Sequence, residues 1–174
     1  MMVEYGKVNP NGVLEFFLQT ANSEDWVVRE FAAAGFRRLI KPCRTVALPW
    51  LKQVARNDNP NLRRFASETL RPVVENRWLI KEPAASLEIL RLLFREAHPY
   101  PRTSVGNNLS DLSRRNPDLI LAIVKELVES GDANSYWIAY RACRNLIKQN
   151  PTKVMDLLGV DEYHYKDRNF YRTS

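Results

Sequence analysis

The stretch RTSVGNNLSDLSRRNPDL, residues 102–119, shows the pattern that determines the fold class. Val105, Leu109 and Leu112 recur at four- and three-residue spacing, which is typical of the buried face of an α-helix. Gly106 and the two asparagines after it lie among them, although glycine and asparagine are poor helix formers. A helix that accepts these residues either turns them to solvent or presents them to a polar partner.

The same periodicity extends through the rest of the chain. Apolar residues recur at three- and four-residue spacing in nearly every segment, and alternating runs of β-branched residues are missing. Proline and asparagine separate these segments, and we expect Ser23 and Asn59 to cap the helices that follow them. The sequence therefore predicts an all-α fold with helices over residues 12–21, 25–40, 45–55, 61–74, 84–97, 102–115, 117–129, 135–149 and 151–158.

Four of the predicted helices carry a small residue at an equivalent position. These residues, separated by 34, 40 and 37 positions, are Ala32, Ala66, Gly106 and Cys143. One helix pair per period is typical of an α-solenoid, and a small residue would let neighbouring helices approach closely. We predict a HEAT-like α-solenoid of antiparallel helix pairs, a single domain over residues 1–174 with 160–174 as a C-terminal tail. An irregular helical bundle is the alternative that the spacing leaves open.

A polar stripe accompanies the small residues. Positions two before, two after and five after each small residue lie on one helix face. All twelve residues except Ala34 are polar, and the full set is Glu30, Ala34, Arg37, Arg64, Glu68, Arg71, Ser104, Asn108, Asp111, Arg141, Asn145 and Lys148. In a solenoid this face would form one concave wall. The solvent side of ordinary amphipathic helices would give the same pattern, so the stripe alone leaves both interpretations open.

The composition of the chain indicates which kind of partner and which cellular environment to expect. The 26 Lys and Arg outnumber the 20 Asp and Glu, and the resulting charge of +6 favours an anionic partner. No apolar run reaches the roughly 20 residues of a membrane span, and the N-terminus lacks a signal-peptide pattern. We expect a soluble, cytoplasmic protein with no membrane partner. Cys43 and Cys143 are too few and too far apart for a disulfide framework or a metal site, so we expect reduced packing residues.

Five segments, in order, resemble successive motifs of the DNA alkylation repair glycosylases of the AlkC/AlkD type. The resemblance covers residues 26–159 and is most specific in NNLSD, which a basic pair and NPDL follow. The matching segments are WVVREFA, NPNLRRFASETLRP, SVGNNLSDLSRRNPDLIL, WIAYRACRNLIKQ and MDLLG. The resemblance implies HEAT-like repeats that grip duplex DNA and excise alkylated, cationic bases in base excision repair. It also implies a protein that associates with the nucleoid when it binds DNA. We expect the protein to be a monomer.

The resemblance assigns the catalytic acids to Glu30, Glu68 and Asp111, and a DNA contact to Arg64. An alkylated base is a good leaving group, so its removal requires stabilisation of a cationic sugar and a positioned water. Carboxylates supply both, because they favour the positive charge and accept the proton of the water. We therefore expect no metal and no cofactor.

The DNA-binding candidates are basic, amide and aromatic residues of the same motifs. Cationic side chains would contact phosphates, and an indole face favours a cationic base, although packing between helices is the alternative for both tryptophans. The candidates are Arg64, Arg71, Arg102, Asn108, Arg141, Arg144, Lys148, Trp78 and Trp137. Trp26 and Trp50 are predicted to be core residues. The aromatic and basic segment 162–174 is a further candidate for nucleic-acid contact.

The chain departs from the family pattern at three places. The segment RPVVENRW, residues 71–78, moves Trp78 two positions later than in relatives. Tyr140 stands where the family usually has histidine, and the first matching motif begins at Trp26, which implies a shorter groove. These departures keep a second hypothesis open: a non-catalytic HEAT-like scaffold that binds DNA or a protein along its concave face.

Overall fold

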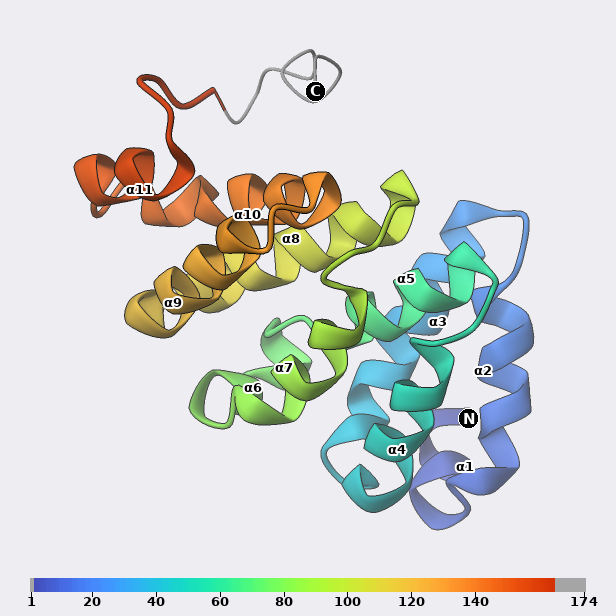
Figure 1. Ribbon diagram of the computed structural model, residues 1–174. Helices are drawn as coiled ribbons and strands as arrows, with labels where there is room; N and C mark the ends of the chain where they lie inside the picture. Colours follow the sequence, from blue (N-terminus) through green and yellow to red (C-terminus); the bar gives the residue numbers. More distant parts are fainter. Residues whose placement is uncertain (1, 165–174) are drawn as a thin grey trace. The chain divides into compact units, whose positions relative to one another are not determined.

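The computed structural model describes residues 2–164, and this part of the chain consists of α-helices, short 3₁₀ turns and loops (Figure 1). No strand occurs within that range, so the predicted all-α class is confirmed. Residues 165–174, which make up most of the predicted tail, lie outside the described range. No helix in the described range is long and apolar enough to cross a membrane.

The chain forms two compact units, an N-terminal unit that ends at Leu93 and a C-terminal unit that begins at Phe94. Each unit contains helices that pack against their neighbours along the chain. That the two units make up one domain stays a prediction.

The N-terminal unit is built around aromatic side chains. The ring centre of Phe36 lies 5.1 Å from that of Phe17, 5.0 Å from Trp50 and 5.5 Å from Phe65. Full burial of such a side chain contributes roughly 1.5–3 kcal/mol, so this cluster fixes the helices that carry it. The helices are α1 (Met2–Val8), α2 (Leu14–Ala21), α3 (Trp26–Ile40), α4 (Arg44–Val54), α5 (Pro60–Thr69), α6 (Trp78–Lys81) and α7 (Ala84–Leu90), with 3₁₀ turns at Asn11–Val13, Val74–Asn76 and Arg91–Leu93.

Up to residue 164, where the described range ends, the C-terminal unit contains four helices, three of which begin with a proline. Proline suits this position because the first helical N–H has no partner within the helix. The connections 114–116 and 130–132 are short, so successive helices run antiparallel. The helices are α8 (Pro99–Ser113), α9 (Pro117–Glu129), α10 (Ala133–Leu146) and α11 (Pro151–Leu158).

The helix boundaries differ from the sequence prediction at several places. The prediction missed α1 and α6, and it extended the helix at 61–74 beyond Thr69, where Pro72 follows shortly. The helix predicted at 84–97 ends at Leu90 and continues only as a 3₁₀ turn. Helix α8 begins before residue 102, because His98 Nδ1 accepts a hydrogen bond from the Tyr100 N–H at 3.2 Å and caps it.

The predicted helix caps and core residues are confirmed at some positions and wrong at others. Asn59 caps α5 as predicted, but Ser23 does not cap α3, because Asp25 accepts from the Val27 N–H at 2.8 Å. Trp50 packs in the aromatic cluster. The prediction that Trp26 is a core residue is wrong, since it is 64% exposed at the first position of α3. The predicted packing role of both cysteines is confirmed, because both are buried with free thiols.

Candidate functional site

The small residues of the predicted repeat lie inside the helix packing. Ala32, Ala66, Gly106 and Cys143 are all buried. The packing is close at Gly106, where an added Cβ atom would lie 2.9 Å from the Cβ of Arg141 on the neighbouring α10. The predicted role of a small residue in close helix approach is therefore confirmed at this position.

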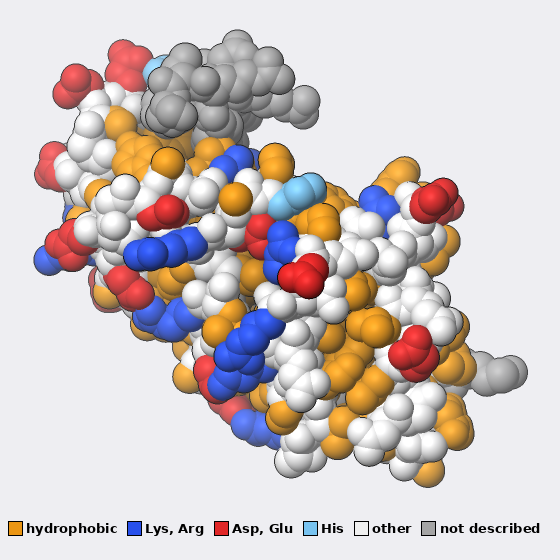
Figure 2. Space-filling model, turned by 45° about the vertical axis from the view of Figure 1, so that its right-hand side comes forward, with side chains coloured by type: hydrophobic (Ala, Val, Ile, Leu, Met, Phe, Trp, Pro, Cys, Tyr) orange, Lys and Arg blue, Asp and Glu red, His pale blue; other side chains and the backbone are white. Residues whose placement is uncertain are grey.

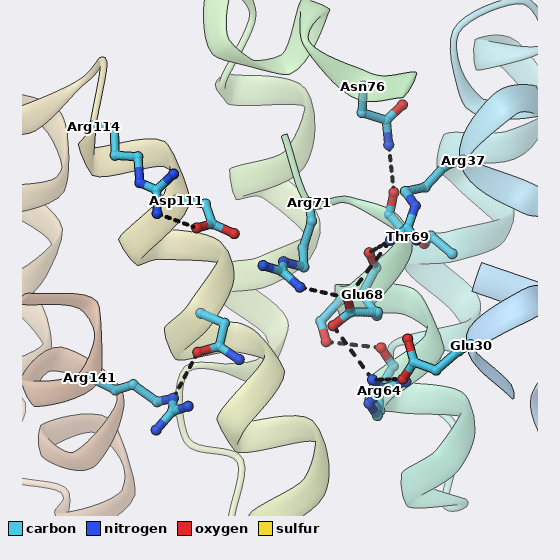
Figure 3. A network of polar contacts seen from close by, with 12 residues as sticks. Glu30, Arg37, Arg64, Glu68, Thr69, Arg71, Asn76, Asp111, Arg114 and Arg141 are labelled. Atoms are coloured by element: carbon cyan, nitrogen blue, oxygen red, sulfur yellow. Dashed lines mark hydrogen bonds and ion pairs between the residues drawn. The ribbon is translucent and has the colours of Figure 1, made fainter. Parts of the chain in front are cut away.

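Glu68 is the centre of a buried ion cluster in the N-terminal unit (Figure 3). Its side chain is only 6% exposed, and Arg71 Nη1 donates to its Oε1 at 3.0 Å. Arg37 Nη1 lies 3.7 Å from the same oxygen and donates to the backbone carbonyl of Glu68 at 3.3 Å. Arg64 Nη2 lies 3.8 Å from Oε2. A buried carboxylate is costly unless it is paired, and three guanidinium groups pair this one.

Arg64 joins a second carboxylate to this cluster. It forms a hydrogen-bonded ion pair with Glu30, whose side chain is 37% exposed. The residues Glu30, Arg37, Arg64, Glu68 and Arg71, which we call the Glu68 cluster, therefore combine three guanidinium groups with two carboxylates. When all five groups are ionised, the cluster carries a net positive charge, which suits a phosphate ligand.

The segment RPVVENRW follows the Glu68 cluster as an ordered turn. Asn76 is fully buried, and its Nδ2 donates to the backbone carbonyl of Thr69 at 2.6 Å (Figure 3). Its Oδ1 accepts from Trp78 Nε1 at 3.2 Å. Trp78 is 8% exposed, and the Arg44 guanidinium lies 5.6 Å from its ring centre. The structure thus places this indole in helix packing, with little surface for a ligand.

Asp111 belongs to the C-terminal unit, on α8. Its side chain is 14% exposed, and Arg114 Nη2 lies 3.9 Å from its Oδ1 (Figure 3). Asn108, one turn earlier, is fully buried. Asn145 of α10 donates through Nδ2 to the backbone carbonyl of Ser110 at 2.7 Å and to its hydroxyl at 2.9 Å. The contacts of Asn145 fix α8 against α10 at Ser110, directly before Asp111 in the sequence.

Three other predicted DNA-binding residues meet in the C-terminal unit. The guanidinium carbons of Arg102 and Arg141 lie 4.7 and 5.5 Å from the ring centre of Trp137. We call these three residues the Trp137 cluster. Arg144 lies half-buried on α10, and Lys148 is exposed just after that helix.

Tyr140 stands where the family that the sequence resembles usually has histidine, and its side chain has a packing role. The Tyr140 ring is fully buried and stacks on Tyr163 at 4.4 Å between centres. The Tyr163 hydroxyl donates to the Tyr140 carbonyl at 2.6 Å, and the Tyr140 hydroxyl accepts from the His164 N–H at 2.7 Å. The first residues of the predicted tail, 160–164, are therefore held against α10 by these hydrogen bonds and by the ring stacking.

Among the predicted site residues, contacts join Glu30, Arg64, Glu68 and Arg71 in the N-terminal unit. In the C-terminal unit, contacts join Arg102, Arg141 and Trp137. The site residues predicted from the sequence do not include Asn76, Asn107 or Arg37. Arg37 belongs to the polar stripe and could have been found there, whereas nothing in the sequence pattern distinguishes Asn76. Figure 2 shows basic, acidic and hydrophobic side chains mixed on the face in view. Within residues 2–164, no three His, Cys, Asp or Glu residues are placed to hold a metal ion.

No protein-family model matches this chain, but individual known proteins are similar to it. The uncharacterized protein YhaZ of Bacillus subtilis (strain 168) is 30% identical over 154 residues, which are 85% of this chain and 40% of YhaZ. The alkylpurine DNA glycosylase AlkC of Pseudomonas fluorescens, solved bound to DNA containing an abasic site analog, is 29% identical with a TM-score of 0.63. The resemblance to AlkC-type glycosylases is thereby confirmed.

The likeness to AlkC covers 74% of this chain but only 36% of AlkC. The chain therefore spans well under half the length of both proteins that it matches.

Proposed function

We propose that the chain binds duplex DNA and excises alkylated, cationic bases, as a monofunctional DNA glycosylase of the AlkC type. The observation that carries this proposal is the combined sequence and fold similarity to AlkC, a glycosylase solved on DNA. The carboxylates and arginines that the family resemblance assigns support it, because each group lies in an ordered network of its own unit.

The proposed reaction breaks the bond between C1′ of the sugar and the base nitrogen. The bonding electron pair leaves with the base, which becomes neutral, and the sugar becomes a cation resembling an oxocarbenium ion. Water then adds to C1′ and gives a proton to a carboxylate. We assign this role to Asp111, whose side chain is packed within the unit yet retains 14% exposure.

We assign different roles to the two acids of the N-terminal unit. Glu68 is surrounded by three guanidinium groups and nearly inaccessible, so it serves best as a positioning residue for Arg37, Arg64 and Arg71. Arg71 is the most exposed of the three at 27% and is the best placed to reach a phosphate. Glu30, at 37% exposure, remains open to a ligand and is the second candidate for a catalytic acid.

A second candidate function is DNA binding without excision. The burial of Trp78 and its hydrogen bond to Asn76 favour this candidate, because the family resemblance expects an indole near the damaged base. A scaffold of this kind would retain phosphate contacts and lack base release.

Release of free base from methylated duplex DNA separates the two candidates. The DNA is treated with a methylating agent, incubated with the protein, and analysed by chromatography against a reaction without protein. We expect methylated purine in the protein sample only. Binding to the duplex without release above background would favour the scaffold, and absence of both would exclude both candidates.

A further inference from the structure

The ring of Trp137 on α10 lies close to the guanidinium groups of two arginines. Both guanidinium carbons of the Trp137 cluster lie within 5.5 Å of one ring centre, from Arg102 on α8 and from Arg141 one turn after the tryptophan. A guanidinium over an indole face is attracted by the negative potential of the ring. Two such contacts on one ring bring like charges close together, and this arrangement is favourable chiefly where an anion is to be bound.

Neutral amides orient both cations. Arg102 Nη1 donates to Asn134 Oδ1 at 2.5 Å, and Arg141 Nε donates to Asn107 Oδ1 at 2.9 Å. An amide acceptor fixes the plane of a guanidinium without cancelling its charge. Burial lowers the pKa of Arg102, and the charge of Glu96 partly offsets this effect. The group still remains protonated at neutral pH.

Gly106 determines where the Arg141 side chain can lie. A Cβ atom on Gly106 would lie 2.9, 3.1 and 3.0 Å from Cβ, Cγ and Cδ of Arg141. The stem of Arg141 therefore runs directly across the glycine, and only glycine leaves room for it in this position. The poor helix formers of the NNLSD segment thus have a physical role, since Gly106 admits the stem and Asn107 holds Nε.

We propose that Arg102 and Arg141 form one phosphate-binding site on the Trp137 platform, with Gly106 and Asn107 as positioning residues for Arg141. The ligand is a phosphodiester of duplex DNA, and in this respect the inference rests on the proposed function. Stacked guanidinium groups keep their planes fixed while their N–H edges point outward, which suits bidentate contact with phosphate oxygens. The same geometry assigns Trp137 to the phosphate site and not to the cationic base, because two cations already lie against its ring.

The test measures binding of an undamaged duplex, and of the same duplex with one abasic-site analogue, at several salt concentrations. We expect Arg102→Ala and Arg141→Ala each to weaken binding on the order of tenfold. The double variant, which removes both cations from the phosphate, should reduce the slope of log affinity against log salt by about 0.9. Gly106→Ala and Asn107→Ala should weaken binding through Arg141, with the fold checked by circular dichroism. Lys125→Ala, which removes a 62% exposed cation of the same unit, is the matched control and should have a smaller effect.

Trp137→Ala distinguishes a phosphate platform from a base-stacking residue. We expect equal loss of affinity for both duplexes, with partial recovery in Trp137→Phe. A loss confined to the damaged duplex would overturn the inference, as would unchanged binding in Arg102→Ala and Arg141→Ala.

The inference and the proposed function can fail separately. If the wild type binds DNA but releases no base, the excision proposal fails while the phosphate site is still measured by binding. If the wild type does not bind DNA, titration with inorganic phosphate decides. Shifts of the Arg102 and Arg141 guanidinium Nη signals in nuclear magnetic resonance spectra would support an anion site, and unchanged signals would overturn it.

Discussion

Glu30 on α3 and Arg64 on α5 form an ion pair from equivalent positions, each two residues before a buried alanine. The two residues are 34 positions apart, and the hydrogen bond between Arg141 and Asn107 spans the same separation. The spacing of 34 between Ala32 and Ala66 is therefore expressed as a side-chain contact between α3 and α5 of the N-terminal unit. The polar stripe is a bonded network at these positions, not merely a solvated surface.

Removing the charge of Glu68 should destabilise the protein. Glu68→Gln leaves three guanidinium groups without their shared carboxylate, in a place where water has little access. Loss of one partner of a buried ion pair typically costs about 3 kcal/mol, and we expect a loss of this size in the free energy of unfolding from urea denaturation.

Glu88→Gln is the matched control for Glu68→Gln. Glu88 pairs with Lys52 in the same unit, but its side chain is 65% exposed. We expect no measurable change in the free energy of unfolding, since exposed pairs contribute little. Equal stability of the two variants would contradict the structural role that we give to Glu68.

The fold class could be predicted because helical periodicity is a local property of the sequence. The pattern of Val105, Leu109 and Leu112 directly reports the buried face of α8. The position of Trp26 could not be predicted in this way, because periodicity does not show whether another element covers a given apolar residue. Trp26 lies at the first position of α3 and remains exposed.

The candidate site could be predicted only in part, for a related reason. Spacing places Glu30, Arg64 and Glu68 on one helix face, and the family resemblance suggests their roles. Spacing does not report burial, so it could not distinguish the enclosed Glu68 from the more exposed Glu30. Nor could it show that Gly106 serves the stem of Arg141, since that contact depends on the packing of two helices.

Salt dependence should identify the phosphate contacts of the Glu68 cluster. Arg71→Ala is expected to reduce the slope of log affinity against log salt by about 0.9 for an undamaged duplex, because one fewer phosphate is neutralised. Lys125→Ala removes a 62% exposed cation that pairs with Glu129 and serves as the control. Identical slopes for wild type and Arg71→Ala, measured by fluorescence anisotropy, would exclude this contact.

The Cys143 thiol should resist modification in the folded protein. Burial raises its pKa to about 12, so at pH 8 only about one molecule in ten thousand carries the reactive thiolate. A Cys43→Ser variant isolates this thiol, and we expect its labelling by a disulfide reagent to follow unfolding as urea is added. Rapid labelling without urea would contradict the prediction.

The same pKa shift predicts a loss of stability in alkali. An unfolded thiol ionises near pH 8.5, whereas folded Cys143 keeps its proton up to about pH 12. Above pH 8.5 the unfolded state therefore binds fewer protons than the folded state, and the free energy of unfolding falls as pH rises. Urea denaturation of the Cys43→Ser variant at pH 8 and pH 10 should show this decrease, and a decrease of the same size after the further change Cys143→Ala would assign it to other groups.

Asp111→Asn separates catalysis from DNA binding. The asparagine keeps the shape of the side chain and part of its hydrogen bonding, so a loss of activity reports the loss of charge. We expect base release from methylated duplex DNA to fall by about a hundredfold or more, because proton acceptance and stabilisation of the sugar cation both depend on the carboxylate. Binding of the undamaged duplex should be unchanged or tighter, since a negative charge that faces phosphates has been removed.

Glu129→Gln, a 65% exposed acid of the same unit, is the control for Asp111→Asn and should leave base release unchanged. Wild-type release by Asp111→Asn would exclude Asp111 as the catalytic acid, and equal losses of release and binding would indicate a structural role instead.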